Sequence, residues 1–140
     1  MKVLLAIDDS KCSEAATQAV VAQYPPLGTQ VQILNVVHLA VPITPSYAGW
    51  FLEEGLKHAQ EVVRRAEQLL NSAGYTVQAA VEEGEPKATI IDYAKRWNAD
   101  LIVVGSHGRK GVERFLMGSV AEAVARHAPC SVEIIRMPRI

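Results

Sequence analysis

The sequence predicts a single α/β domain over residues 1–140, built as a doubly wound parallel sheet. Short apolar runs rich in β-branched residues, typical of buried strands, alternate with longer segments whose apolar residues recur at helical spacing. The resulting order is β-α-β-α-β-α-β-α-β, and strands joined by helices of this length form right-handed crossovers. The natural closure is a five-stranded sheet in the order 3-2-1-4-5 with helices on both faces.

Composition excludes several classes of protein. With 49% hydrophobic residues in 140, the chain suits a globular fold with a normal core. A formal net charge of −1 gives no electrostatic reason to expect nucleic acid or a membrane surface as partner. The two cysteines, Cys12 and Cys130, form no metal-ligand cluster. No apolar run approaches the ~20 residues of a membrane span, and none resembles a signal peptide, so we expect a soluble cytoplasmic protein.

The first third of the chain contains two strands and one helix. The apolar run after Met1 ends at Asp8-Asp9, and Ser10 is a natural N-cap for the helix that follows. Two prolines and Gly28 end that helix. The expected elements are the strand Lys2–Ile7, the helix Lys11–Tyr24 and the strand Gln30–Val37.

The segment Leu39–Phe51 is expected to be a loop rich in apolar groups. Two prolines, Pro42 and Pro45, argue against regular helix through it, and three aromatic residues lie close together within it. Such a loop can pack on the domain, cover a ligand as a flap, or form part of a partner surface. The sequence leaves these three alternatives open.

The rest of the chain alternates helices and strands. A one-sided apolar stripe predicts a long helix ending near Gly74, and Pro86 suits the first turn of another helix. The expected elements are the helix Leu52–Ser72, the strand Tyr75–Val81, the helix Pro86–Trp97, the strand Leu101–Val104, the helix Gly118–His127 and the strand Ser131–Met137.

A glycine-rich loop follows the buried strand Leu101–Val104 and leads to a helix that opens at Gly118-Ser119. Glycines let backbone N–H groups approach an anion closely, and the first turn of a helix offers unpaired N–H donors. This arrangement favours a phosphate site, although a βα loop whose glycines only make turns is the alternative. The loop matches neither the Walker A motif, the G-x-G-x-x-G fingerprint, nor the G-x-S-x-G nucleophile motif.

The spacing Gly105-x2-Gly108-x9-Gly118-Ser119 resembles the ATP-binding signature of the universal stress protein family, G-x2-G-x9-G-[S/T], at every defining position. The resemblance covers essentially the whole chain. It implies the same sheet order, 3-2-1-4-5. In such a sheet, ligands bind outside the carboxyl ends of the strands where the winding reverses, here between the first and fourth strands. Asp8 and the glycine loop should therefore meet at one crevice.

The resemblance also implies roles for residues around the base and ribose. Asp8 stands in an Asp-x-Ser pattern, as in family members, and is expected to bind a ribose hydroxyl or an adenine edge. Helix capping is its alternative role. Ala6 and Ile7 would lie beside the base and Val104 would cover its other side. Val36 matches the position whose backbone reads the adenine edge, with a register uncertainty of one residue toward Val37.

The phosphates are expected along the loop and the following helix. Gly105 and Gly108 would let the loop bend near the ribose and α-phosphate. Backbone N–H groups of Gly118, Ser119 and Val120, with the Ser119 hydroxyl, would bind the β- and γ-phosphates. Candidate charge partners of the phosphates are Arg109, Lys110 and Arg114. His107, which lies in the same loop, has no paired acid at motif spacing, so a structural role is favoured over general-base catalysis.

The favoured function is a stress-response regulatory module that binds ATP, with Mg²⁺ as a possible companion, and shows a nucleotide-dependent surface to an unknown protein partner. Binding is expected to order residues 106–117. No convincing catalytic set is visible, so the sequence leans against an enzyme. The alternatives are a nucleotide-free dimeric interaction protein, a slow ATPase and a cyclic-nucleotide binder. The last strand, Ser131 to Met137, is apolar enough to need cover, and family members commonly form homodimers through it.

Overall fold

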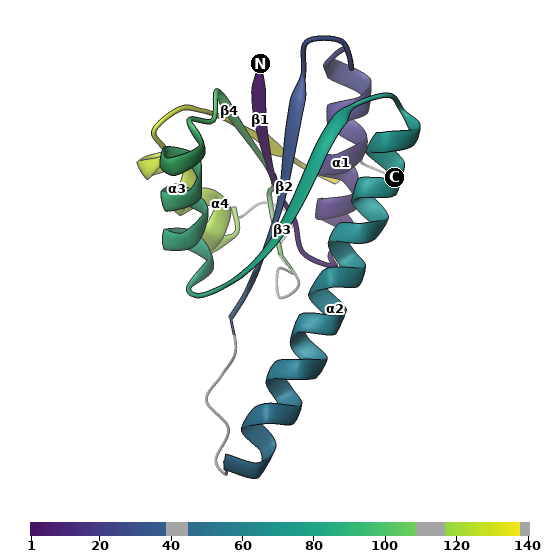
Figure 1. The fold of residues 1–140 in the computed structure, drawn as a ribbon. Coiled ribbons are helices and arrows are strands. Elements are labelled where there is room, and N and C mark those ends of the chain that lie inside the picture. The colour runs from purple at the N-terminus through teal and green to yellow at the C-terminus, as the bar shows by residue number, and fades with distance from the viewer. Residues whose placement is uncertain (39–44, 109–116, 138–140) are drawn as a thin grey trace.

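The computed structural model describes residues 1–38, 45–108 and 117–137, with side chains described from 53 onward in the second range. These residues form five strands and four helices in strict alternation (Figure 1). In chain order they are β1 (Lys2–Ala6), α1 (Lys11–Gln23), β2 (Gln30–Val37), α2 (Pro45–Ser72), β3 (Thr76–Glu83), α3 (Pro86–Trp97), β4 (Leu101–Gly105), α4 (Ser119–His127) and β5 (Ser131–Ile135).

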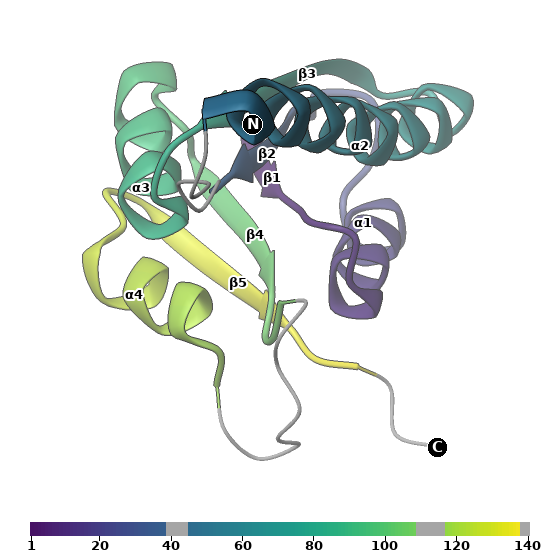
Figure 2. The same cartoon turned by 90° about the horizontal axis from the view of Figure 1, so that it is seen from below.

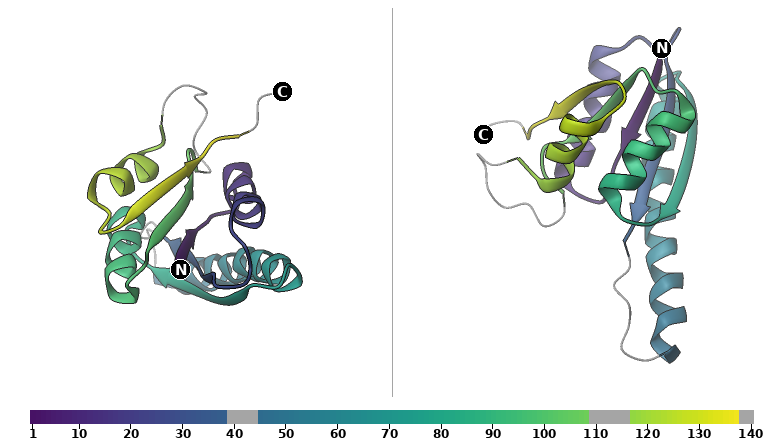
Figure 3. Two further views of the ribbon diagram at one scale, coloured as in Figure 1. Left: turned by 90° about the horizontal axis from the view of Figure 1, so that it is seen from above. Right: turned by 90° about the vertical axis from the view of Figure 1, so that its left-hand side faces the viewer.

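All five strands pair in parallel, in the order β3-β2-β1-β4-β5, which confirms the expected topology. The central strand β1 is in register with β2 on one side and with β4 on the other, where Ala6 pairs with Leu34 and with Val104 respectively. The winding reverses between β1 and β4, because α1 and α2 lie on one face of the sheet and α3 and α4 on the other (Figures 2 and 3).

The two faces of the sheet form two separate apolar clusters because successive side chains of a strand point to opposite faces. Val3, Leu5 and Ile7 pack beneath α1 and α2. Leu4 and Ala6 pack beneath α3 and α4. Nearly all of these strand side chains are inaccessible to solvent, as expected for a parallel sheet covered on both faces.

Most element boundaries agree with the expected ones to within one or two residues, which is the usual uncertainty of helix and strand ends. One prediction was wrong. Residues 45–51 were expected to be loop, yet they form the first two turns of α2, which begins at Pro45 and runs for 28 residues. Proline is well tolerated at the first helical position, where its missing N–H has no intrahelical partner to lose. Residues 39–44, which include Pro42, lie outside the described residues.

Helix α2 reaches well beyond the sheet edge at its N-terminal end (Figure 1). Its 28 residues correspond to about 42 Å at ~1.5 Å per residue. Tyr47, Trp50 and Phe51 therefore belong to this helical extension and not to a loop. Among the helices of the described ranges, none is long and apolar enough to cross a membrane.

Candidate functional site

Two neighbouring strands end at the same edge of the sheet and define the crevice. Ala6 ends β1 and is in register with Val104, one residue before the end of β4. The chain continues straight past β1, because the Ile7 backbone N–H still bonds to the Leu34 carbonyl of β2 at 2.9 Å. The β1–α1 turn and the loop after β4 consequently face each other.

The β1–α1 turn is held by its own side chains. Asp8 Oδ1 accepts hydrogen bonds from the Ser10 backbone N–H at 2.8 Å and the Ser13 hydroxyl at 2.9 Å. Ser10 Oγ in turn accepts from the Ser13 backbone N–H at 3.1 Å and caps α1. Asp8 Oδ2 accepts no hydrogen bond from any described residue, so one carboxylate oxygen shapes the turn and the other remains available.

Ser106 ties together three elements at the start of the glycine loop. Its backbone N–H donates to the Ile135 carbonyl of β5 at 2.8 Å, and its carbonyl accepts from the Gly118 N–H at 2.7 Å. Its side-chain oxygen lies 3.1 Å from His107 Nδ1. Ser106 is only 4% exposed. The residue therefore fixes where α4 begins relative to β4.

The same contacts correct one expected donor. The Gly118 N–H was expected to bind phosphate, but it is already bonded to the Ser106 carbonyl. The free donors of this helix start one residue later. His107 Nδ1 lies 3.1 Å from Ser106 Oγ, while its buried Nε2 has no hydrogen-bond partner among the described residues.

The three glycines of the motif are needed for different reasons. A Cβ on Gly105 would lie 2.9 Å from the backbone carbon of Cys12, so this glycine lets α1 pack against the end of β4. On Gly118 it would lie 2.9 Å from the Ser106 carbonyl oxygen, and on Gly108 2.9 Å from Asp8 Oδ2. Distances below 3.0 Å to backbone atoms cannot be relieved by a side-chain rotation, so two of the three positions exclude larger residues unless the backbone moves.

The N-terminus of α4 has no side-chain cap. Gly118 occupies the N-cap position in an extended conformation and has no side-chain acceptor. Because a helix leaves its first N–H groups without intrahelical partners, Ser119, Val120 and Ala121 present three such groups. None of the three is hydrogen-bonded to a described residue. By contrast, α3 is capped by the Glu85 carboxylate, which accepts from the Ala88 N–H at 2.9 Å.

These features surround one cavity of about 600 Å³ on the α3–α4 side of the sheet. Of the predicted site residues, all that lie in the described ranges line it: Ala6, Ile7, Asp8, Val36, Val104, Gly105, Gly108, Gly118, Ser119 and Val120. Arg109 lies outside the described residues, as do Lys110 and Arg114. Of the two candidates in β2, Val36 lines the cavity.

Several lining residues were missed by the sequence analysis. Leu34 and Ile90 extend the apolar wall, His38 and Pro86 close one end, and Met117 stands at the start of α4. His38 Nδ1 lies 3.2 Å from the Gly84 carbonyl, which links the ends of β2 and β3. The contribution of α3 follows from the topology, since α3 and α4 cover the same face. The exact residues depend on helix placement, which no sequence motif encodes.

The described residues contain no group of three or more His, Cys, Asp or Glu side chains arranged to hold a metal ion. Within this part of the chain the cavity's polar groups are instead one carboxylate, hydroxyls, two imidazoles and backbone N–H groups. This set of hydrogen-bond donors and acceptors is chemically suited to a ligand with hydroxyls and a terminal anion.

Comparison with known proteins yields a family and relatives of matching length. The Universal stress protein family matches residues 1–136. A universal stress protein of Methanocaldococcus jannaschii is 30% identical over 141 residues, covering 99% of this chain and 83% of the relative. The solved universal stress protein UspA of Lactobacillus plantarum is 30% identical, with a TM-score of 0.85 over 97% of both chains. A universal stress protein crystallised in complex with cAMP is 25% identical, with a TM-score of 0.73 over 96% of both chains.

Proposed function

The chain belongs to the universal stress protein family, and we propose that its α3–α4 cavity binds an adenine nucleotide, with ATP as the preferred ligand. Nucleotide occupancy would then regulate a protein partner. The observation that carries this proposal is the uncapped N-terminus of α4, which opens into a cavity shared with the end of β1.

The phosphate end of the proposed ligand is supported by the free backbone donors. Three successive N–H groups, those of Ser119, Val120 and Ala121, lie at the positive end of the α4 dipole, and Ser119 adds a hydroxyl. Anions bind favourably at such a terminus because they supply the acceptors that the helix lacks. A triphosphate would use more of these donors than a monophosphate, which favours ATP.

The base and ribose ends are supported by the opposite part of the cavity. Ala6, Val36 and Val104 give it apolar walls, which suit a flat adenine ring. Asp8 Oδ2 faces the loop at Gly108 and is left free by the turn contacts of Oδ1, so it is the natural acceptor for a ribose hydroxyl. The solved relative in complex with cAMP is a protein in which an adenine nucleotide is bound to this fold.

A direct experiment tests the ligand. The purified protein is denatured and the released small molecules are identified by chromatography and mass spectrometry. Nucleotide-free protein is then titrated with ATP, ADP, AMP and cAMP by calorimetry, with and without Mg²⁺. We expect ATP to bind with a stoichiometry of one per chain and more tightly than AMP or cAMP. Equal affinities for AMP and ATP would remove the triphosphate from the proposal, and no binding of any of the four would reject it.

Slow ATP hydrolysis at the same site is the alternative function. It requires Mg²⁺-dependent turnover that is lost in Asp8→Ala or His107→Ala. Unchanged rates in both variants would assign any residual turnover to something other than this cavity. Nucleotide binding by the cavity does not depend on whether the bound ATP is hydrolysed.

A homodimer through β5 is the second part of the proposed function. Strand β5 is an edge of the sheet and pairs with β4 alone among the described strands. Its apolar residues Val132, Ile134 and Ile135 are only partly buried. Pairing with β5 of a second copy would satisfy the open backbone groups of this edge and cover these side chains. Sedimentation at micromolar concentration distinguishes the outcomes, since a clean monomer would remove the dimer.

A further inference from the structure

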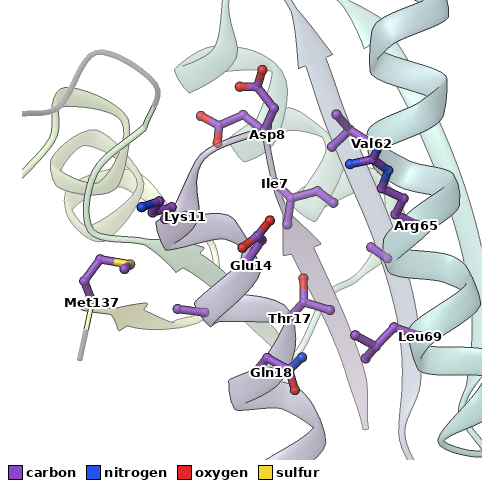
Figure 4. A pocket seen from close by; sticks show the side chains of 13 residues that line it. Ile7, Asp8, Lys11, Glu14, Thr17, Gln18, Val62, Arg65, Leu69 and Met137 are labelled. Atoms are coloured by element: carbon purple, nitrogen blue, oxygen red, sulfur yellow. The ribbon is translucent and has the colours of Figure 1, made fainter.

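The end of β1 lies between two cavities, and their linings differ in charge. On the face covered by α1 and α2, a cavity of about 490 Å³ is lined by charged side chains of both signs, Asp8, Lys11, Glu14 and Arg65 (Figure 4). This lining favours no single class of ligand. The cavity proposed for the nucleotide, on the α3–α4 face, has instead one end where a lone polar side chain stands among apolar ones.

That end of the nucleotide cavity is formed by β2, by the residue that follows it and by α3. Its apolar lining residues are Leu34, Val36, Pro86 and Ile90. Among the described residues, His38 is the one polar side chain that this end contributes. Because alternate residues of a strand share a face, His38 lies on the same face as Val36 and about 7 Å beyond it. His38 is therefore the next side chain past the position proposed for the adenine edge.

The imidazole of His38 is held through one of its two nitrogens. His38 Nδ1 lies 3.2 Å from the Gly84 carbonyl oxygen, and the Gly84 N–H donates to the Val37 carbonyl at 3.0 Å. A carbonyl oxygen only accepts, so Nδ1 is the nitrogen that carries the hydrogen. In the neutral ring, Nε2 then has a lone pair and no hydrogen. No described residue donates to it, so His38 offers an acceptor to a ligand at this end of the cavity.

The backbone of Val36 is open beside this acceptor. In a parallel ladder, successive residues direct their N–H and C=O groups to opposite neighbouring strands. The Leu34 carbonyl accepts from the Ile7 N–H on the β1 side, whereas the Val37 carbonyl accepts on the β3 side. Val36, two residues after Leu34, consequently directs both groups toward β1, which has already ended at Ala6. No hydrogen bond joins Val36 to the described chain after β1.

From this arrangement we propose that His38 selects the base of the nucleotide, an inference that rests on the proposed function. His38 Nε2 accepts a hydrogen bond from the exocyclic 6-amino group of adenine. This amino group has two hydrogens, so it donates one to His38 and the other to the Val36 carbonyl. A purine with a 6-oxo group has an acceptor at the same position, and that acceptor would face the Nε2 lone pair. The cavity therefore favours adenine over hypoxanthine and guanine.

The test compares ATP with inosine triphosphate, which has the same ribose and phosphates but a 6-oxo group in place of the amine. Both are titrated by calorimetry into nucleotide-free protein at about pH 8, where imidazole side chains are neutral. We expect ATP to bind at least about tenfold more tightly than inosine triphosphate. Equal affinities would overturn the assignment of His38 and leave phosphate binding intact. Binding of neither nucleotide would reject the proposed function together with this assignment.

Three variants locate the discrimination, which is measured as the ratio of the two affinities. His38→Leu removes the acceptor, and we expect the ratio to fall about fivefold, as for the loss of one hydrogen bond. His38→Lys replaces the acceptor with a donor and should move the preference toward inosine triphosphate. His127→Leu is the matched control, an exposed histidine of α4 outside the cavity, and should keep the ratio of the unmutated protein.

The ratio is insensitive to lost stability, because both nucleotides are titrated into the same protein and a partly unfolded variant weakens both alike. Circular dichroism checks the fold of each variant. An unchanged ratio in His38→Leu and in His38→Lys would contradict the assignment, and so would an equal fall in His127→Leu.

Discussion

Helices α1 and α4 follow the neighbouring strands β1 and β4 and lie on opposite faces of the sheet, yet their N-termini are completed in different ways. Ser10 caps α1 with its hydroxyl, and Asp8 secures Ser10. At α4 the N-cap is Gly118, which has no side chain to offer. The protein supplies a side-chain acceptor for a backbone N–H group at the start of α1, whereas the N–H groups at the start of α4 remain open to the cavity.

The difference separates a helix terminus that the protein completes with its own side chains from the terminus at which we propose that phosphates bind. An unsatisfied helix terminus costs stability unless water or a ligand supplies acceptors. Helix α3 also follows the structural pattern, with Glu85 as its cap. The open terminus at α4 is therefore a consequence of the local sequence and not of the fold. A glycine stands at its N-cap, where a Cβ would lie 2.9 Å from the Ser106 carbonyl oxygen.

The largest expected effect comes from forcing a side chain into the open terminus. Gly118→Leu puts a Cβ 2.9 Å from the Ser106 carbonyl oxygen and 3.3 Å from the His107 Cα, so α4 must shift. We expect ATP affinity in calorimetry to fall by more than about 100-fold, since several charge-assisted hydrogen bonds of ~1.5–3 kcal/mol each are misaligned together.

A second glycine serves as the control for lost stability. Gly28 has a positive φ of 86° and open space around its Cβ position, far from the cavity. Gly28→Ala should lower the free energy of unfolding by about 1 kcal/mol through backbone strain and leave ATP affinity unchanged. If Gly118→Leu binds ATP as well as the unmutated protein, the phosphates do not lie at α4.

A pair of proline substitutions tests the two termini directly. Ser119 and Lys11 both occupy the first helical position, where proline is tolerated, and each follows an extended residue, with ψ of 155° and 160° respectively. Ser119→Pro removes one N–H and one hydroxyl from the open terminus, and we expect roughly tenfold weaker ATP binding. Lys11→Pro should leave ATP affinity unchanged.

Ser119→Ala separates the two lost donors, because it keeps the N–H and removes the hydroxyl alone. Its ATP affinity should fall between those of the unmutated protein and Ser119→Pro. Equal losses of ATP affinity in Ser119→Pro and Lys11→Pro would contradict phosphate binding at the α4 terminus alone.

The smallest expected effects come from removing the N-caps of α1 and α3, and they are effects on the free energy of unfolding. Ser10→Ala and Glu85→Ala should each lower the free energy of unfolding by about 1 kcal/mol in urea titrations, the usual cost of losing an N-cap. The hydrogen bond from the Ala88 N–H holds the pKa of Glu85 below its ordinary value of 4.5. The stability that the Glu85 carboxylate contributes is thus fully present above pH 4.5 and is lost as the pH falls below the lowered pKa. The stability gap between Glu85→Ala and the unmutated protein should close in acid, whereas a constant gap would contradict the cap.

The order of strands could be predicted because the alternation of strands and helices leaves few topologies, and the crevice followed from that order. Helix α2 differs from the prediction at its start, because Pro45 occupies the first helical position, where proline is compatible with a helix. A proline read without its position in the helix is ambiguous.

The details of the candidate site depended on distances that no motif carries. The glycine spacing predicted which loop lines the cavity. Two details depend on three-dimensional packing: Gly105 leaves room for α1, and the Gly118 N–H donates to the Ser106 carbonyl.

The central claim is that phosphates bind the open N-terminus of α4 and not the capped one of α1, and an amide NMR titration tests it most directly. ATP and adenosine are added separately to ¹⁵N-labelled protein. The amides of Ser119, Val120 and Ala121 should shift strongly with ATP and little with adenosine, while those of Lys11 to Ser13 change little with either. Equal responses of the α4 amides to ATP and adenosine, or a larger response at α1, would contradict the claim.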